Sequence, residues 1–237
     1  MVNNKKIIAI IPARKGSKRL KNKNILKILN KPLIYWTIIS ALKSEFIDNI
    51  VVSTDSDAII DIASRLSKKI IIIRRPKHLA RSTTKTLKVV EHVFKILKQK
   101  KKLDHSLFIL LQPTSPLRHY KIIDDSIKFF LNQKSALSLV SVFKNSYSNK
   151  NNITIDKYGY LKNTFNYKHK KNNITINGAI YISHVKKILD IKAFFEKKCI
   201  TYFMKENLSI DIDTIDDFKH ASLKLKQKNI ISNFRIK

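Results

Sequence analysis

Short apolar runs alternate with capped segments through the first half of the chain, and this rhythm is its strongest constraint on the fold. The expected strands cover residues 6–11, 50–54, 70–73 and 107–111. The expected helices cover residues 32–44, 55–66 and 83–100, with Pro32 opening the first, residues 55–57 capping the second and Thr83 or Thr84 capping the third. Nearly continuous apolar runs are typical of parallel strands buried on both faces. The alternation therefore predicts a parallel sheet with right-handed helical crossovers.

The pattern changes after about residue 141. Residues 145–152 are polar and rich in Asn, which predicts a loop, and residues 152–156 and 160–165 flank Gly159 as a hairpin or protruding arm would. The expected later elements are a strand at 173–182, a helix from Val185, a strand near 200–204 and a helix over 214–227. We expect one α/β domain over residues 1–237 with a mostly parallel central sheet flanked by helices and a small inserted arm.

Charge is the most unusual feature of the composition. The chain has 48 Lys and Arg against 17 Asp and Glu, a formal net charge of +31 at pH 7. The lysines are spread along the whole chain and accompany heavy use of Asn and Ile, so drift toward A/T-rich codons explains the excess better than a nucleic-acid surface. Nucleic acid is therefore an unlikely partner, although the charge favours anionic ligands. The hydrophobic fraction of 43% suffices for an ordinary core and excludes wholesale disorder.

The number of cysteines and the lengths of the apolar runs indicate the cellular compartment in which the protein is expected. Cys199 is the only cysteine, which excludes an internal disulfide framework and a multi-cysteine zinc site and fits a reducing cytoplasm. The first apolar run is short and is followed at once by Arg14 and Lys15, unlike a signal peptide. No run approaches the roughly 20 apolar residues of a membrane span. We expect a cytoplasmic protein without a membrane partner.

The loop after the first expected strand, residues 12–24, contains a glycine, a serine hydroxyl and several cations. These groups suit a triphosphate, which needs close backbone approach, hydrogen-bond donors and charge neutralisation. Ligands of open α/β sheets also bind at the carboxyl ends of strands. The spacing matches neither the P-loop nor the dinucleotide fingerprint, and a basic surface turn is the alternative.

A second polar loop follows the fourth expected strand. Pro113 and Pro116 limit its flexibility, so that Gln112, Thr114 and Ser115 present polar groups from a rigid base. Such groups suit a polyhydroxylated ligand. The alternative is a strand-to-helix turn in which the hydroxyls cap the helix.

Two carboxylates stand close together near the end of the chain, where acidic residues are otherwise scarce. If residues 209–214 are extended, Asp211 and Asp213 face one side and the intervening isoleucines face the other. Two such carboxylates can hold Mg²⁺ against phosphate oxygens. The alternative is that Asp213 or Thr214 only caps the last helix.

The order and spacing of the motifs resemble those of the acylneuraminate cytidylyltransferase family, which makes CMP-activated nonulosonic acids such as CMP-sialic acid. The resemblance runs from Ile8 to about Leu223. It rests on Ala-Arg-x-x-Ser-Lys through Lys23-Asn24, Val-Ser-Thr-Asp at 52–55, Arg75-Pro76 with Leu79-Ala80, Leu-Gln-Pro-Thr-Ser-Pro-Leu-Arg at 111–118, Asn-Gly-Ala-Ile-Tyr-Ile at 177–182, Phe194-Phe195 and Ser-Ile-Asp-Ile-Asp-Thr at 209–214.

The resemblance implies a Rossmann-like nucleotidyltransferase fold, a homodimer joined through an arm at about residues 142–174, and a Mg²⁺-dependent reaction of CTP with a sugar acid that serves cell-surface polysaccharide biosynthesis. The candidate nucleotide-binding residues are Arg14, Gly16, Ser17, Lys18, Lys23, Asn24, Arg75, Ala80 and Ser82. The candidate sugar-binding residues are Gln112, Thr114, Ser115, Tyr181, Phe194 and Phe195. The candidate catalytic residues are Arg14, Lys23, Asp211 and Asp213, with the two aspartates as the metal ligands.

The chain departs from the family pattern in two places. Residues 81–83 lack the usual carboxylate, with Ser82 in that loop, and the cations for the sugar carboxylate are replaced at best by Lys150, Lys168 or Lys170. The altered sugar half suggests a nonulosonic acid other than N-acetylneuraminic acid, such as a legionaminic- or pseudaminic-type sugar. The alternatives are a 3-deoxy-octulosonate cytidylyltransferase, a catalytically impaired nucleotide-binding homologue and a nucleic-acid-binding protein.

Overall fold

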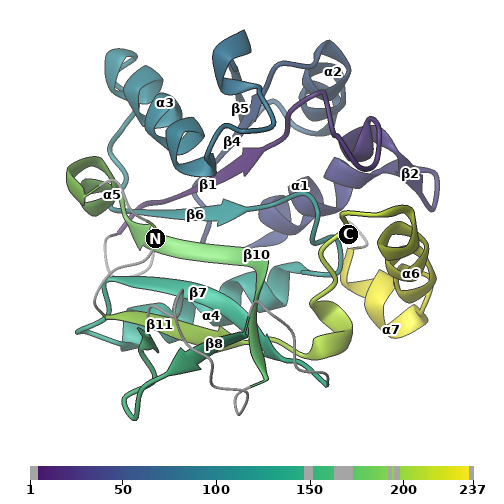
Figure 1. Ribbon diagram of the computed structural model, residues 1–237. Coiled ribbons are helices and arrows are strands. Elements are labelled where there is room, and N and C mark those ends of the chain that lie inside the picture. Colours follow the sequence, from purple (N-terminus) through teal and green to yellow (C-terminus); the bar gives the residue numbers. More distant parts are fainter. Residues whose placement is uncertain (1–4, 147–151, 163–172, 192–193, 195–197, 235–237) are drawn as a thin grey trace.

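A mixed sheet forms the centre of the computed structural model, which describes residues 5–146, 152–162, 173–191, 194 and 198–234. The sheet runs in the order β11-β7-β10-β6-β1-β4-β5, with β8 and β9 attached through β10 (Figure 1). The strands of this path are β1 (Ile7–Pro12), β4 (Asn49–Thr54), β5 (Ile70–Arg74), β6 (Leu107–Leu111), β7 (Ser138–Lys144), β10 (Ile174–His184) and β11 (Cys199–Phe203). Strands β6, β1, β4 and β5 pair in parallel, whereas β10 is antiparallel to both of its neighbours, so the expected mostly parallel sheet is confirmed.

The order in which strands are added to the sheet reverses at β1, and this creates a switch in strand order. The connection from β1 leads to β4 on one side, and β6 later pairs with β1 on the other side. The loops that leave the carboxyl ends of β1 and β6 therefore diverge and leave a crevice between them. This crevice is where the two polar loops found in the sequence, residues 12–24 and 112–119, emerge.

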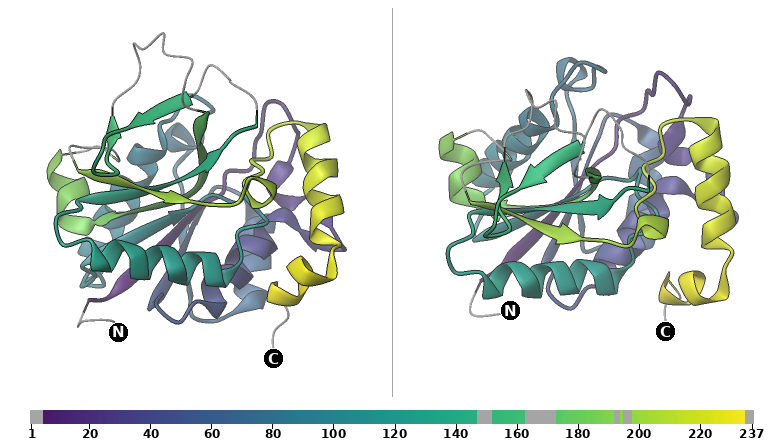
Figure 2. Two further views of the ribbon diagram at one scale, coloured as in Figure 1. Left: turned by 90° about the horizontal axis from the view of Figure 1, so that it is seen from below. Right: turned by 60° about the horizontal axis from the view of Figure 1, so that its bottom comes forward.

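The C-terminal part of the chain packs against the first helix. The helices are α1 (Leu33–Lys43), α2 (Asp57–Leu66), α3 (Thr86–Gln99), α4 (Tyr120–Asn132), α5 (Val185–Ile191), α6 (Ile215–Leu225) and α7 (Lys228–Ile231). Trp36 of α1 meets Phe234 edge-to-face with ring centroids 5.2 Å apart, and Ile212, Leu225 and Ile230 join the same apolar cluster. Figure 2 shows α6 and α7 at one side of the molecule. This packing holds residues 211–213 beside the crevice.

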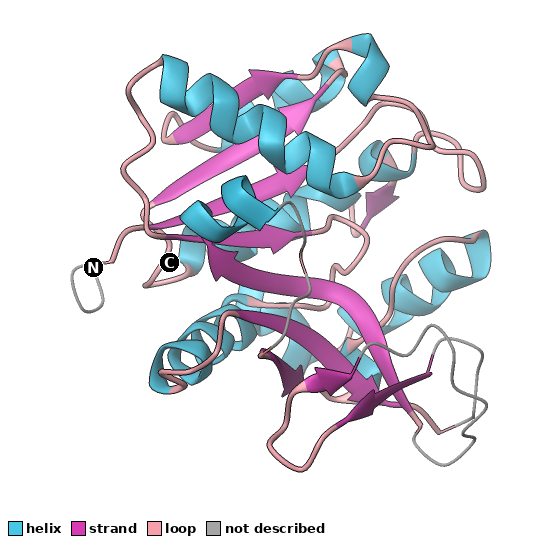
Figure 3. Ribbon diagram, turned by 60° about the vertical axis from the view of Figure 1, so that its left-hand side comes forward, coloured by secondary structure: helices cyan, strands magenta, loops and turns pink. Residues whose placement is uncertain are grey.

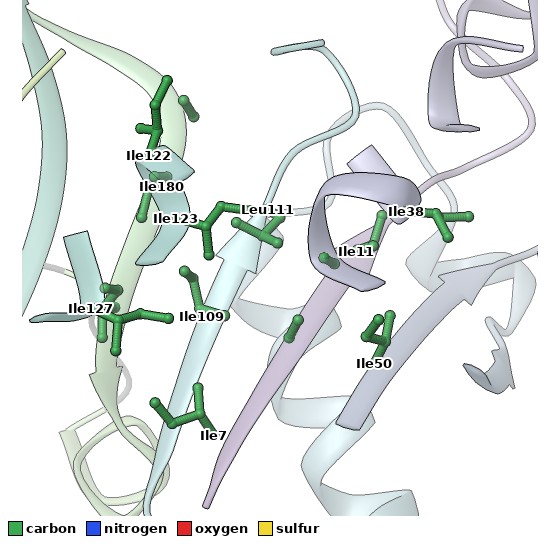
Figure 4. Close-up of a cluster of buried hydrophobic side chains, with 14 of the residues drawn as sticks. Ile7, Ile11, Ile38, Ile50, Ile109, Leu111, Ile122, Ile123, Ile127 and Ile180 are labelled. Atoms are coloured by element: carbon green, nitrogen blue, oxygen red, sulfur yellow. The ribbon is translucent and has the colours of Figure 1, made fainter. Parts of the chain in front are cut away.

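The strands are covered by helices on both faces. Ile8 and Ile10 of β1 point to the face that α3 and α5 cover, and these helices lie in front of the strands in Figure 3. Ile7, Ala9 and Ile11 point to the opposite face and pack with residues of α1, α2 and α4 (Figure 4). Burial of alternate residues on opposite faces explains why the sequence of β1 is apolar without interruption.

Shorter elements complete the described structure. They are β2 (Lys27–Ile28), β3 (Lys31–Pro32), β8 (Asn152–Ile155), β9 (Leu161–Lys162), and the 3-10 turns η1 (Lys23–Ile25), η2 (Lys77–Leu79), η3 (Glu206–Leu208) and η4 (Ser232–Phe234). Strands β8 and β9 pair antiparallel, as the hairpin expectation requires. The rest of the predicted arm, at residues 147–151 and 163–172, lies outside the described residues.

Helix capping agrees with the sequence in two cases and differs in one. The Ser56 hydroxyl accepts a hydrogen bond from the Ile59 amide at the start of α2, and Thr214 forms a capping box with Asp217 at the start of α6. The expectation that Thr83 or Thr84 caps the third helix is wrong, because α3 begins later, after Lys85. The Thr84 hydroxyl donates instead to the carbonyl of His78 within the preceding loop.

None of the helices in the described parts of the chain combines the length and the apolar character needed to cross a membrane.

The buried imidazole of His119 makes the stability of the fold depend on pH. Burial lowers the pKa of His119 to about 4, so the folded state keeps the ring neutral. In the unfolded chain the ring takes up a proton near pH 6.5, and stability is therefore lost as the pH falls from about 6.5 towards 4. Because water still reaches part of the ring, we expect this residue alone to cost only about 1 kcal/mol of unfolding free energy between pH 7.5 and 5. Urea unfolding at both pH values measures it. A His119→Gln variant that shows the same fall as the wild type would contradict it.

Candidate functional site

A cavity of about 370 Å³ opens at the carboxyl ends of β1 and β6, in the crevice made by the switch in strand order. Its walls come from the loop after β1, the segment between β5 and α3, the start of the loop after β6, and Asp213 before α6. These four segments are far apart in the chain and meet only because the sheet and the C-terminal packing bring them together. The position is the usual ligand site of an open α/β sheet.

Positive charge dominates the wall of this cavity. The cations of the wall are Arg14, Lys18, Arg19, Lys23, Arg75 and Arg81. Among the described residues that line the cavity, Asp213 is the sole carboxylate. An excess of fixed cations in a concave site concentrates anions there, and the cavity is suited to a polyanionic ligand such as a triphosphate.

Arg75 is a fixed cation of the wall. Its side chain is buried; Nη2 donates to the carbonyl oxygen of Ser53 at 2.9 Å and Nε donates to the Ser53 hydroxyl at 3.4 Å. Burial lowers the pKa of Arg75 to about 10, while the nearby Asp55 acts in the opposite direction. The guanidinium therefore stays charged at neutral pH and is held in one orientation at the ends of β4 and β5.

The loop after β1 is held in place by its own residues. The Nδ2 atom of Asn24, a buried residue, donates to the carbonyl oxygen of Arg14 at 3.0 Å. This contact closes the basic loop on itself and directs Arg14 and Lys23 toward the same cavity.

Lys23 and Asp213 form the link between the two ends of the chain. The Lys23 Nζ atom donates to Asp213 Oδ1 at 3.0 Å and to the carbonyl of Ile212, and Arg19 Nη1 contacts Asp213 Oδ2 at 2.9 Å. The Lys23 side chain is only 12% exposed, whereas that of Arg19 is 71% exposed. The Lys23 contact is therefore better shielded from water than the Arg19 contact.

Asp211 lies beside Gln112 across a glycine. A β-carbon at Gly178 would stand 3.6 Å from Asp211 Oδ2 and 3.7 Å from Gln112 Oε1. Asp211 remains accessible to solvent. Nevertheless, loss of water around the carboxyl raises the pKa of Asp211, and the neighbouring charge of Asp213 raises it further. The two carboxylates are separated by one residue in the segment that precedes α6.

The two aspartates fit Mg²⁺ by the chemistry of their oxygens. Mg²⁺ is usually held by one or two carboxylates, and substrate phosphates and water complete its coordination. Within the described residues, no third His, Cys, Asp or Glu joins the pair into a metal-binding group. The pair would therefore hold the ion together with a bound phosphate. The expected alternation is also present, since Ile212 is buried in the cluster around Trp36.

Most of the predicted nucleotide and catalytic residues meet at the cavity. It is lined by Arg14, Ser17, Lys18, Lys23, Asn24, Arg75, Ser82 and Asp213, and by Gln112 and Thr114 from the sugar-binding set. Gly16 lies in the same loop, and a β-carbon there would be 3.7 Å from Arg14 Nη1. Ala80 ends the turn η2 without reaching the cavity wall. The roles of these residues stay predictions.

Three predicted sugar-binding residues lie away from the cavity wall. Ser115 is 1% exposed and its amide donates to the carbonyl of Gln112, so it shapes the turn. Tyr181 packs against Phe194 with ring centroids 5.7 Å apart, and Phe194 packs against Phe108. The alternation of β10 directs Tyr181 to the face covered by α3 and α5, and α3 also contributes Thr86 and Val89 to the cavity wall. Phe195 lies outside the described residues.

The sequence analysis gave no binding role to several residues of the wall. They are Pro12, Arg19, Leu20, Arg81, Pro113, Thr84, Thr86 and Val89. Arg19 and Leu20 continue the basic loop, and Arg81 follows the Leu79-Ala80 motif. Their positions next to recognised motifs were therefore the signal from which a place at the site could have been predicted.

Known proteins resemble this chain along most of its length. The cytidylyltransferase family model matches residues 8–236. An N-acylneuraminate cytidylyltransferase of Escherichia coli is 35% identical over 229 residues, which are 94% of this chain and 53% of that protein, so the chain spans about half of that relative. A pseudaminic acid cytidylyltransferase of Campylobacter jejuni is 32% identical over 232 residues, covering 93% of this chain and 97% of that protein.

A solved structure extends the likeness to the fold. CMP:2-keto-3-deoxy-manno-octonic acid synthetase, solved with CTP, has a TM-score of 0.70 and 14% sequence identity, and the match covers 94% of this chain and 99% of that one. At such an identity the likeness concerns the fold alone. It confirms the nucleotidyltransferase fold that the sequence resemblance implied.

Proposed function

Because this chain belongs to the cytidylyltransferase family, we propose that it joins CMP from CTP to a nonulosonic acid and releases pyrophosphate. The observation that carries the proposal is the cation-lined cavity at the switch point, with Asp213 on its wall and Asp211 two residues earlier in the same segment. The names of the two relatives, which act on sialic-type and pseudaminic acids, support the choice of sugar class.

The cations of the cavity would bind the triphosphate. Arg14, Lys18 and Lys23 come from the loop after β1, and Arg75 is fixed at the end of β5. Because Lys23 and Arg75 are held by hydrogen bonds before the substrate arrives, these two cations need little reorganisation as charge moves onto the leaving pyrophosphate. Phosphoryl transfer demands mainly positioning and neutralisation of this kind, which a rigid basic cavity supplies.

The sugar would enter from the side of β6. Gln112 and Thr114 line the cavity there, and Gln112 offers an amide to a polyhydroxylated acid, whereas the hydroxyl oxygen of Thr114 is enclosed. The anomeric hydroxyl of the acid would then attack the α-phosphorus of CTP, and the bond between this phosphorus and the pyrophosphate oxygen would break. Asp211 and Asp213 would hold Mg²⁺, whose charge, when bound, stabilises the phosphate oxygens.

The identity of the acid, the assembly and the compartment belong to the same proposal. The lysines in place of the usual sugar-carboxylate cations favour a pseudaminic- or legionaminic-type acid. We also propose a homodimer joined through the arm at about residues 142–174 and a role in cell-surface polysaccharide synthesis. The lone, buried Cys199 suits a reducing cytoplasm.

Pyrophosphate release tests the proposed reaction directly. The protein is mixed with CTP, Mg²⁺ and one acid at a time from a panel of N-acetylneuraminic, legionaminic-type, pseudaminic-type and 3-deoxy-octulosonic acids. We expect release with a nonulosonic acid. Release with the octulosonic acid alone would replace the proposed substrate class, and CTP binding without release from any acid would support an impaired homologue. Steeply salt-dependent nucleic-acid binding without CTP binding would refute a nucleotidyltransferase.

A further inference from the structure

Arg118 is completely enclosed in the protein and has no acidic partner within the described residues. It ends the loop that follows β6, and its exposed fraction is 0%. Burial lowers the pKa of the guanidinium to about 9, which leaves it charged at neutral pH. A buried cation without a carboxylate is costly unless several hydrogen-bond acceptors surround it. The hydrogen-bond acceptors around Arg118 therefore indicate its structural role.

The acceptors of Arg118 come from three separate parts of the fold. Nη1 donates to the carbonyl oxygen of Gln112 at 3.2 Å and to that of Ala179 at 2.8 Å. Nη2 donates to the Thr37 hydroxyl of α1 at 2.9 Å, and this hydroxyl in turn donates to the Gln112 carbonyl at 3.5 Å. The planar fork of an arginine can hold such a set in one geometry, which a lysine cannot.

The contact with Ala179 falls where β10 is irregular. Its register with β7 shifts between Ile176 and Tyr181, so Ala179 lies in the stretch between the two regular parts of that ladder. Arg118 gives the Ala179 carbonyl a donor at this interruption. The neighbouring Gly178 has φ of +71°, a backbone conformation that glycine adopts without strain.

The two carbonyls tied by Arg118 lie on either side of the place where Gln112 and Asp211 both approach Gly178. One belongs to Gln112 itself, and the other belongs to the residue after Gly178, beside which the side-chain oxygens of Gln112 and Asp211 lie. A shift of either backbone segment would change where the Gln112 amide points within the cavity. Arg118 reaches neither the cavity nor the proposed substrates.

We propose that Arg118 is a positioning residue, which holds the Gln112 backbone against β10 so that the Gln112 amide meets the acid substrate in register with the CTP phosphates. This inference rests on the proposed function, because it assigns the Gln112 side chain to the acid. Errors of about 1 Å in such placement can cost about 100-fold in rate. Loss of the arginine fork is therefore expected to affect the reaction more strongly than the binding of CTP.

Steady-state kinetics of single and double variants test the inference. We expect Arg118→Lys to lower kcat/KM for the acid about 10- to 100-fold, with the KM for CTP within about twofold of the wild type. Thr37→Val leaves Arg118 in place and removes its Nη2 acceptor, so it should give a smaller loss of the same kind. Arg65→Lys, at an exposed residue of α2 paired with Asp61, is the matched control and should be unchanged.

A double-mutant cycle separates positioning from a general structural role. In a Gln112→Ala background there is no amide left to place, and Arg118→Lys should then lower kcat/KM by less than about threefold. An equal loss in both backgrounds, or no loss in the single variant, would overturn the inference.

Amide hydrogen exchange gives a readout that does not depend on turnover. Peptides over residues 112–118 and 177–182 should exchange faster in Arg118→Lys, while a peptide over residues 57–66 should not change. Wild-type protein without turnover on any acid would refute the proposed function and leave this exchange comparison to decide the positioning. Unchanged exchange at residues 112–118 would overturn the positioning role in either case.

Discussion

Asp213→Ala will lower kcat at least about 100-fold, on the scale of losing one preorganised electrostatic group, yet will bind CTP as tightly as the wild type or tighter. The expectation follows from the position of the carboxylate, which lies on the cavity wall and pairs with Arg19 and Lys23. Its removal frees both cations for the triphosphate, and this offsets any attraction that the carboxylate exerts on bound CTP through Mg²⁺. The reaction loses one of its two proposed metal-binding carboxylates.

Calorimetric titration with CTP and steady-state pyrophosphate release measure the two quantities separately. Asp216→Ala is the matched control. It removes the same charge from an exposed residue that lies three positions after Asp213 and pairs only with Lys219 in the described structure. The control should retain wild-type kcat. Equal losses of kcat and CTP affinity in Asp213→Ala would contradict a role specific to turnover.

Lys23→Met will weaken CTP binding about 10- to 100-fold, which is the size expected when a charged hydrogen bond is removed. Of the two cations that pair with Asp213, Lys23 is the more enclosed. The Lys23 side chain also lines the cavity. Methionine keeps much of the side-chain volume but removes the charge. The substitution also leaves Asp213 with only the exposed Arg19 as an ion-pair partner among the described residues, which adds repulsion toward phosphate.

Lys21→Met provides the comparison for this variant. Lys21 is exposed in the same loop and does not line the cavity. Its replacement changes the net charge by the same amount and should alter the CTP dissociation constant less than about twofold, on the scale of a screened surface charge. Similar losses in the two variants would show that overall charge, and not the position of Lys23, controls binding.

Two elements of the fold escaped the sequence analysis for identifiable reasons. Strand β7 contains Ser138 and Ser141, which interrupt its apolar character, but the Ser141 hydroxyl is buried and bonded to Asn177 and to the backbone of Ile180. Helix α4 contains Asp124 on its buried face, where Ser44 donates a hydrogen bond to it. In both cases a polar residue is buried because a partner from a distant part of the chain satisfies it.

The candidate site divides in a similar way. The loop after β1 and the pair of aspartates could be recognised because each motif is continuous in sequence and follows a strand or precedes a helix. The ion pair of Lys23 with Asp213 joins residues 190 positions apart, and no local pattern indicates it. The packing of Tyr181 against Phe194 likewise could not be read from its motif, and the role of Tyr181 at the site stays a prediction.

The amino-acid sequence sufficed to predict the strands buried on both faces, the capped helices at Ser56 and Thr214, and the loops that carry the candidate ligand-binding residues. These features depend on apolar periodicity and on hydrogen bonds between residues a few positions apart. The three-dimensional packing was needed to show which cations meet Asp213, that Gln112 and Asp211 both approach Gly178, and which groups surround Arg118. Those relations depend on which strands become neighbours and on the packing of the C-terminal segment against α1, and both are set by the burial of surfaces that lie far apart in the chain.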